Sequence, residues 1–512
     1  MHNKSAQQIY SALEGKRYQY VDRARACSKL TLPYIMPDAG FGSHSRLDTP
    51  FASVAARGVN NLASKLLLAL LPPNAPLFRL NVDSYGMKQE GTPDEVISSI
   101  EASLQQVEEA VMDEVSRESY RSALHEALKH LIITGNVLLY MPDDGGMRVF
   151  HLDRFVIERD AMGNIVYIAT KESISYAALS EELRQIVGYD ESPEEECDLY
   201  TAVCRKENGW HIFQDIKGVR VPESEGFYKL DKNPFIPLRF NRIDGENYGR
   251  SYVEEYLGDV QSLESLTRAI VEGSSAAAKV LFLVNPNGTT RARTLAESPN
   301  GAITQGNAGD VSVLQLNKFN DFRVAQETMN TIKDRLGHAF LLTSGVVRNA
   351  ERVTAEEIRM LSLEIESSLG GLYSLLATEL QLPMVTRLMD VMSKKKRLPK
   401  LPKDVINPVI ITGVEALGRG HDLQKLDMFL AGAGQVVGQQ AVAQYVNVAE
   451  YFKRRATSLG IKTVGLVKTE EEMQAEMQAQ QQMEMAQNVA PTGVKAISDQ
   501  LKAQQDQQVS EE

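Results

Sequence analysis

Cysteine is scarce in this sequence, with three residues in 512. Cys27, Cys197 and Cys204 cannot all pair and form no Cys-x-x-Cys motif, which argues against a disulfide framework or a structural zinc site. Long apolar runs are scarce too. The most apolar segment, LASKLLLALLPP, ends in two prolines before it is long enough to cross a bilayer. We therefore expect a soluble protein without membrane contact, made in a reducing compartment such as a cytoplasm.

Positive charge is also in deficit. Lys and Arg number 55 against 67 Asp and Glu, a net charge of -12, which argues against a general DNA-coating protein. The sequence holds no Walker lysine motif, nucleophile elbow or HExxH. The spacing of the glycines in GAGQVVG is wrong for a dinucleotide loop. We predict that the protein is not an enzyme and needs no cofactor or metal.

The first half of the chain predicts an α+β region over residues 1–248. Thr49 and Pro50 predict a helix start, and helical patterns follow at 93–118 and 120–134. From residue 136 the period changes to that of strands, and a hairpin turn is predicted at Asn208-Gly209.

The next part predicts two long helices with a small unit between them. Residues 249–279 have one continuous apolar stripe and predict a single helix. Residues 280–322 predict loops with short strands, and residues 323–342 a second helix. A polar loop, 343–353, follows.

The segment 354–392 predicts a helix with three breakers. Thr354 and Glu357 have the spacing of a capping box. An apolar stripe then continues past Gly370, Gly371 and Pro383, which predicts one helix with kinks; two helices joined by a Gly-Gly turn are the alternative. The stripe consists of Ile358, Leu361, Ile365, Leu369, Leu372, Leu376 and Leu380.

A basic run and an acidic tail mark the end of the chain. Residues 394–397 follow the helix, where cations complement its negative end; a nucleic-acid or partner contact is the alternative. Residues 393–467 also predict a strand at NPVIITG and a further helix. The tail, 468–512, is rich in Gln and Met and has 3 Lys against 9 Asp and Glu, which predicts partial disorder.

Five segments resemble the portal (head-to-tail connector) proteins of short-tailed podovirus and autographivirus-type phages. They lie in order along the chain: TPFASVAARGVNNLASKLLLALLPP, ALKHLIITGNVLLYMP, NYGRSYVEEYLGDVQSLESL, ERVTAEEIRMLSLEIESSLGGLYSLLATELQLP and TGVEALGRGHDLQKL. The resemblance implies a helix-dominated α+β portal fold that assembles as a dodecameric ring around a channel for double-stranded DNA. Another ring-forming virion protein, such as a head-tail adaptor, is the alternative.

The resemblance also implies a division of the chain. It assigns residues 1–248 to the wing, 249–279 and 323–342 to two stem helices and 280–322 to the clip. Residues 343–353 become the tunnel loop, 354–392 the long kinked helix, and 393–467 the completion of the wing and the crown.

Particular residues and partners are implied in the same way. Tunnel-loop residues Arg348, Asn349, Glu351 and Arg352 would meet DNA, Gly370, Gly371 and Pro383 would bend the helix, and Arg291, Arg293 and Glu297 would face the terminase and tail. The implied partners are the terminase large subunit, the scaffolding and major capsid proteins, a tail adaptor (tail tubular) protein and internal core proteins. The protein would nucleate procapsid assembly, attach the tail and lie in the virion at one capsid vertex, where DNA is packaged and later ejected.

Overall fold

The computed structural model describes most of the chain before residue 438. Described are residues 4–42, 45–72, 77–81, 94–179, 181, 183–184, 196–277, 281–314, 319–342, 355–369, 371–398, 409–412, 419–438, 446, 451–452 and 455. The chain divides into two units, Met1–Leu417 and Gly418–Glu512. Among the described residues, no helix is long and apolar enough to cross a bilayer.

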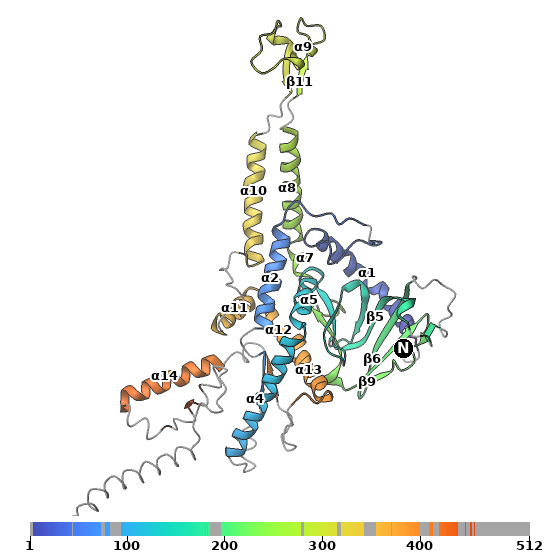
Figure 1. The fold of residues 1–512 in the computed structure, drawn as a ribbon, viewed down its shortest axis with the longest axis vertical. Helices are drawn as coiled ribbons and strands as arrows, with labels where there is room; N and C mark the ends of the chain where they lie inside the picture. The colour runs from blue at the N-terminus through green and yellow to red at the C-terminus, as the bar shows by residue number, and fades with distance from the viewer. Residues whose placement is uncertain are drawn as a thin grey trace, which may run out of the picture. The chain divides into compact units, whose positions relative to one another are not determined.

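The first helix, α1 (Ala6–Lys29), covers one face of an antiparallel sheet in the first unit (Figure 1). Ser5 and Gln8 form a capping box at its start. The strand order is β4-β5-β6-β7-β8, and β9 also pairs with β7. The strands span β4 (Phe155–Arg159), β5 (Ile165–Ser175), β6 (Glu196–Lys206), β7 (Gly209–Ile216), β8 (Val219–Arg220) and β9 (Gly226–Tyr228).

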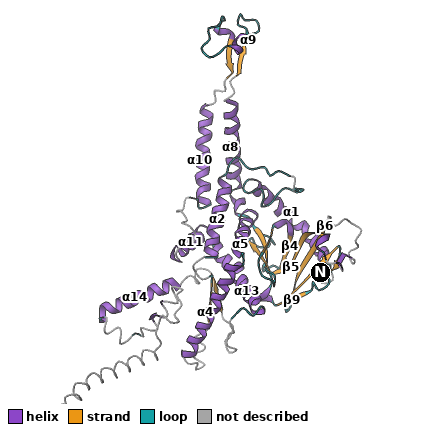
Figure 2. Ribbon diagram, viewed as in Figure 1, coloured by secondary structure: helices purple, strands orange, loops and turns teal. Residues whose placement is uncertain are grey.

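Two smaller sheets lie among helices (Figure 2). One has the order β10-β2-β3, and the other pairs β1 with β13. The largest apolar core forms where α2, α4, α5 and the later helices meet. These elements are α2 (Val54–Leu70), β1 (Phe78–Asn81), α4 (Asp94–Arg117), α5 (Tyr120–Thr134), β2 (Asn136–Tyr140), β3 (Arg148–Phe150), β10 (Phe235–Arg239) and β13 (Val409–Thr412).

Further along the chain, α8 (Leu257–Ala277) and α10 (Phe319–Ala339) lie side by side. Between them in sequence, β11 (Leu281–Val284) pairs antiparallel with β12 (Val311–Leu314), and α9 (Ala292–Glu297) lies within that excursion. The strands predicted for this segment are thus confirmed; α9 was not predicted.

One helix with kinks was predicted over 354–392, but the chain breaks at the left-handed Gly371 between α11 (Ala355–Ser368) and α12 (Leu372–Leu376), which is the alternative of separate helices joined at the glycines. A π-helical turn (Ala377–Gln381) and α13 (Leu382–Lys394) follow. Every described residue of the predicted stripe is at least partly buried. Ile358 and the predicted capping residue Thr354 lie outside the described side chains. The second unit contains α14 (Arg419–Val437), and the 468–512 tail lies outside the described residues.

Three predicted boundaries were wrong. The helix expected from Thr49-Pro50 begins only at Val54. The helix expected over 249–279 is divided at Tyr256 into α7 (Tyr252–Glu255) and α8, because Tyr256 adopts φ -108° and ψ 12°, outside the helical region.

The third error concerns a hairpin. Lys206 pairs with Gly209, so the two turn residues are 207 and 208, and Gly209 is already the first residue of β7. A β-carbon at Gly209 would lie 2.2 Å from the Tyr228 carbonyl oxygen. Glycine is therefore required here for the close approach of β9 rather than for the turn.

Candidate functional site: the α8–α10 pair and the junction at its base

The α8–α10 pair is held by apolar side chains on one row of each helix. Val260 and Leu263 of α8 are buried together with Met329, Ile332 and Leu336 of α10. The three-and-four spacing of these residues aligns them along facing stripes.

Close backbone approach adds to this packing. A methyl group at Gly273 of α8 would lie 2.8 Å from the ring of Phe322 on α10. Thr267 Oγ1 donates a hydrogen bond of 3.4 Å to Met329 Sδ. The helices therefore fit along much of their length.

The outer faces of the pair have little net charge. Together the two helices contain six acidic and four basic residues. One pair joins the helices, because Arg335 Nη2 lies 3.0 Å from Asp259 Oδ1. Val271 and Val324 remain exposed on these faces. The pair thus presents a weakly acidic surface with apolar positions rather than a basic stripe.

A buried carboxylate joins α8 to the start of α2. Glu264 Oε1 and Oε2 accept hydrogen bonds of 3.1 and 2.9 Å from the amides of Phe51 and Ala52. Arg268 lies 3.7 Å from Glu264 and stacks on the Phe51 ring. This contact fixes the segment that leads into α2 against α8.

The C-terminal end of α10 is clamped to α2. Asn61 Nδ2 donates hydrogen bonds of 3.0 Å to the carbonyls of both Phe340 and Leu341, and Lys65 Nζ donates one of 3.1 Å to Leu341. Leu341 has φ 54°, in the left-handed region. A methyl group at Gly58 would lie 2.6 Å from Phe340 Cγ. We call this contact the junction.

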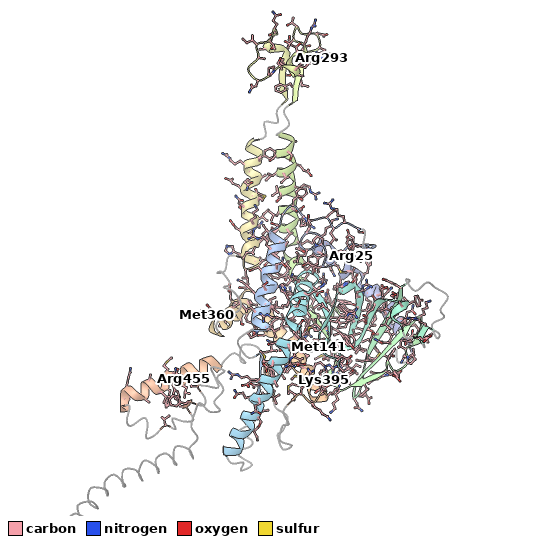
Figure 3. The ribbon with its side chains drawn as sticks, in the orientation of Figure 1. Arg25, Met141, Arg293, Met360, Lys395 and Arg455 are labelled. Carbon is pink, nitrogen blue, oxygen red and sulfur yellow. The ribbon has the colours of Figure 1, made fainter. Side chains whose placement is uncertain are left out.

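The junction lies directly before the predicted DNA-contacting loop. Arg348, Asn349, Glu351 and Arg352 all lie outside the described residues. The chain is described again from α11, where Ile365 is buried against the core and Met360 and Leu363 are exposed (Figure 3).

The break after α11 is built around Gly371. Gly371 has φ 88°, where a side chain is strained. Glu366 Oε2 accepts a hydrogen bond of 3.0 Å from the Ser374 amide, and Oε1 one of 2.7 Å from its hydroxyl. The side chain of Glu366 thus caps the start of α12. Gly370 lies outside the described residues.

Pro383 follows a widened helical turn. The amide of Leu382 bonds to the carbonyl of Ala377, five residues earlier, which is a π-type bond. Pro383 then occupies the first turn of α13, where its missing amide hydrogen costs little. Gln381 Nε2 donates a hydrogen bond of 2.7 Å to the Leu70 carbonyl, which fixes this turn to the end of α2.

The basic run at the end of α13 is engaged within the protein. Lys394 Nζ lies 3.0 Å from both Asp143 and Asp390, and Arg397 Nη1 lies 2.6 Å from Glu114. Lys395 donates to the carbonyl of Asp144. The structural interpretation of residues 394–397 is therefore favoured over a nucleic-acid contact.

The remaining predicted residues lie at α9. Arg293 Nε is 2.9 Å from Glu297 Oε1, and both side chains are exposed; Arg291 precedes the helix and is exposed too (Figure 3). The structure thus brings Arg293 and Glu297 together. Neither the Glu264 contact nor the junction could be predicted from sequence, because their partners are 212 or more residues apart along the chain.

Known proteins are similar in sequence to this chain along nearly its whole length. The family described as bacteriophage head to tail connecting protein matches residues 3–466. The portal protein of Escherichia phage T7 is 40% identical over 509 residues, covering 98% of this chain and 94% of its own. That of Enterobacteria phage SP6 is 30% identical over 512 residues, covering 96% of each.

Among solved structures, a chain from the virion of a native gene transfer agent particle has a TM-score of 0.36 and 11% identity, covering 80% of this chain and 90% of its own. The family match and the portal proteins of T7 and SP6 span nearly the whole chain. On these findings, the chain belongs to the family of bacteriophage head-to-tail connecting proteins.

Proposed function

We propose that this chain forms a dodecameric ring at one capsid vertex, through which double-stranded DNA is packaged and later ejected. The observation that carries the proposal is the family match over residues 3–466 together with relatives named portal protein along almost the full length. The ring would also nucleate procapsid assembly and attach the tail.

The parts of the chain receive roles in the same proposal. Residues 1–248 serve as the wing, α8 and α10 as the stem, and the β11–α9–β12 excursion as the clip. Residues 343–353 serve as the tunnel loop, 354–392 as the kinked helix, and 393–467 complete the wing and form the crown. The stem assignment is supported by the apolar packing of α8 on α10, which suits a long two-helix wall.

Exposed apolar side chains support self-association. Val271, Val324 and Met360 are exposed on helices whose other faces are already packed. Neighbouring copies would cover these positions in a ring, since apolar surface gains about 25 cal/mol per Å² on leaving water.

The junction would then hold the tunnel loop at the channel. Asn61 and Lys65 bind the carbonyls of Phe340 and Leu341, just beyond the end of α10 and shortly before residue 343. Arg348, Asn349, Glu351 and Arg352 would make transient contacts with passing DNA. The weakly acidic α8–α10 pair would limit adhesion, because a duplex gripped through six to ten phosphates dissociates slowly.

Partners in this proposal come from the family. Arg291, Arg293 and Glu297 would face the terminase large subunit during packaging and the tail adaptor protein afterwards. Scaffolding, major capsid and internal core proteins would meet other surfaces, and host cytoplasm is the expected place of synthesis.

Electron microscopy of the purified protein in negative stain tests the proposal. We expect rings of twelve copies with a central hole wide enough for a duplex. A monomer at high concentration, or a closed assembly without a hole, would contradict it. A head-tail adaptor would also form rings, so the second measurement is packaging: capsids assembled without this chain should take up no DNA if it is the packaging conduit.

A further inference from the structure

A cavity of about 810 Å³ in the first unit has no role in the function proposed above. It lies between the β4–β5 turn, β10 and the start of α13, and Phe235, Pro237 and Leu382 form part of its wall. Its volume is in the range of sites that hold small organic ligands.

Four arginines line this cavity. They come from four places in the chain: Arg159 at the end of β4, Arg205 on β6, Arg239 on β10 and Arg242 just beyond β10. The acidic residues in the lining are Glu379 and Asp231. Charges of the same sign, brought together by strands distant in sequence, are unfavourable unless something of opposite charge lies among them.

Main-chain carbonyls fix the direction of two of these guanidinium groups. Arg159 Nε donates a hydrogen bond of 3.2 Å to the Asn247 carbonyl, and Arg159 Nη1 donates one of 3.0 Å to the Gly163 carbonyl. Arg242 Nη2 donates to the Met162 carbonyl at 3.0 Å. These side chains are thus positioned before any ligand arrives, which lowers the entropy cost of binding.

Arg239 is the most deeply buried of the four. Its side chain is 3% exposed, and its Nη2 lies 3.7 Å from Glu379 Oε1, beyond hydrogen-bond distance. Within the described part of the chain, Arg239 Nε has no hydrogen-bond partner. A buried charged donor without an acceptor is costly, and an added acceptor would remove that cost.

The electrostatics of Arg159 agree with this geometry. Burial and the neighbouring charge of Arg239 lower the pKa of Arg159 to about 10, and Arg242 adds to the effect. The positive charge of the cluster is therefore only partly offset by Glu379.

We propose that this arginine pocket binds an oxyanion. The oxyanion is a carboxylate or phosphate group, and the small apolar part that carries it contacts the apolar wall of the cavity. Guanidinium groups recognise such anions through paired hydrogen bonds. The anion has two possible sources: a free solute, or an acidic side chain of a neighbouring copy in the ring. The second source rests on the proposed function.

Calorimetric titration of the unassembled full-length chain with inorganic phosphate, at constant ionic strength in chloride, tests the binding. Arg242→Gln should weaken phosphate affinity by about tenfold, because it removes one charged donor from an exposed position where folding is not at risk. Glu379→Gln should act in the opposite direction and tighten binding severalfold, because it removes a competing carboxylate. Arg46→Gln, which makes the same charge change at an exposed position outside the cavity, should leave affinity unchanged.

Ring formation distinguishes the two sources. If a neighbouring copy supplies the anion, phosphate should bind the free chain but not the ring, and Arg242→Gln should lower the ring fraction seen by mass photometry. A free solute should bind chain and ring alike. The proposal is overturned if phosphate binding is absent or insensitive to Arg242→Gln and ring formation is unaffected as well. If the protein forms no rings at all, the proposed function is contradicted. The titration of the free chain with phosphate still tests whether the pocket binds an oxyanion.

Discussion

At the scale of single residues, Glu264 is a buried charge with a defined task. Its two carboxylate oxygens accept hydrogen bonds from the amides of Phe51 and Ala52, so α8 holds the segment that leads into α2. Hydrogen bonds to a charged group contribute about 1.5–3 kcal/mol each when buried. The residue therefore links two elements that are far apart in sequence.

Glu264→Gln should lower the free energy of unfolding by about 1–3 kcal/mol, because the neutral amide offers one acceptor oxygen where two amides now bond. Urea unfolding followed by circular dichroism measures the change. Glu272→Gln is the matched control, since Glu272 is exposed on the same helix. Equal loss in both variants would show that the charge, rather than the contact, matters.

His130 provides a second residue-scale prediction. It is buried in α5, and burial, assisted by the nearby His151, lowers its pKa from 6.5 to about 3. The opposing influence of Asp153 is smaller. In the unfolded chain His130 is therefore protonated as the pH falls below about 6.5, whereas in the folded chain it stays neutral down to about pH 3. Stability supplied by neutral His130 is complete above about pH 6.5 and is lost as the pH falls toward 3.

The expected slope is about 1.4 kcal/mol of stability per pH unit between roughly pH 4 and 6, from this one group. His130→Gln removes the titration, so the difference in unfolding free energy between wild type and variant should change with pH by that amount. Urea midpoints at pH 4.5, 5.5 and 7.5, at a single protein concentration, measure it. A constant difference across this range would contradict the assigned environment of His130.

At the scale of elements, Gly371 divides a helix whose apolar stripe continues on both sides. An alanine at φ 88° costs about 1–2 kcal/mol, although space is not limiting, since only Glu366 Oε1 lies near, at 3.9 Å. The Glu366 cap and the π-type turn before Pro383 then set the direction of the following helices. The break between α11 and α12 is therefore stabilised by specific contacts.

The double variant Gly370→Ala/Gly371→Ala should impair ring assembly or DNA packaging more than it impairs folding of the protomer, because alanine disfavours the left-handed backbone of Gly371 on which the break depends. Ring fractions in negative stain and packaged DNA per capsid measure the first effects, and thermal unfolding the last. Gly258→Ala in α8 is the control, since open space surrounds that position. Normal rings with full packaging in the double variant would exclude the bend as a requirement.

How far the sequence predicts these elements depends on the range of the forces involved. Periodicity is local, so the helices 93–118 and 120–134 and the stripe through Leu376 could be foreseen. The contact of Glu264 with the segment before α2 could not, because its partners are more than 200 residues apart in sequence. Nor could the role of Gly209, whose close neighbour is the carbonyl of Tyr228 on another strand. The arginine pocket could not be predicted for the same reason, since Arg159 and Arg239 are 80 residues apart in sequence.

At the scale of the whole molecule, the acidic balance of the chain bears on how DNA could pass through a ring. A protein that neutralises six to ten phosphates loses about 10³- to 10⁵-fold in affinity between 50 and 200 mM salt. Two of the four residues in the basic run 394–397 form internal ion pairs and Lys395 donates to a main-chain carbonyl, while α8 and α10 together are slightly acidic. Few cations therefore remain in these elements to hold a duplex.

Isolated rings should accordingly bind a linear duplex with a shallow salt dependence. We expect about three phosphate contacts or fewer, which corresponds to an affinity loss of about fortyfold or less between 50 and 200 mM salt. Fluorescence anisotropy of labelled DNA measures it. Arg348→Gln/Arg352→Gln in the predicted loop should flatten the slope further, because these arginines are the expected contacts. Arg291→Gln/Arg293→Gln makes the same charge change at α9 and should leave the slope as it is. A steep slope typical of six or more contacts would mean that the ring grips DNA, and a slope indifferent to the loop variant would place the contacts elsewhere.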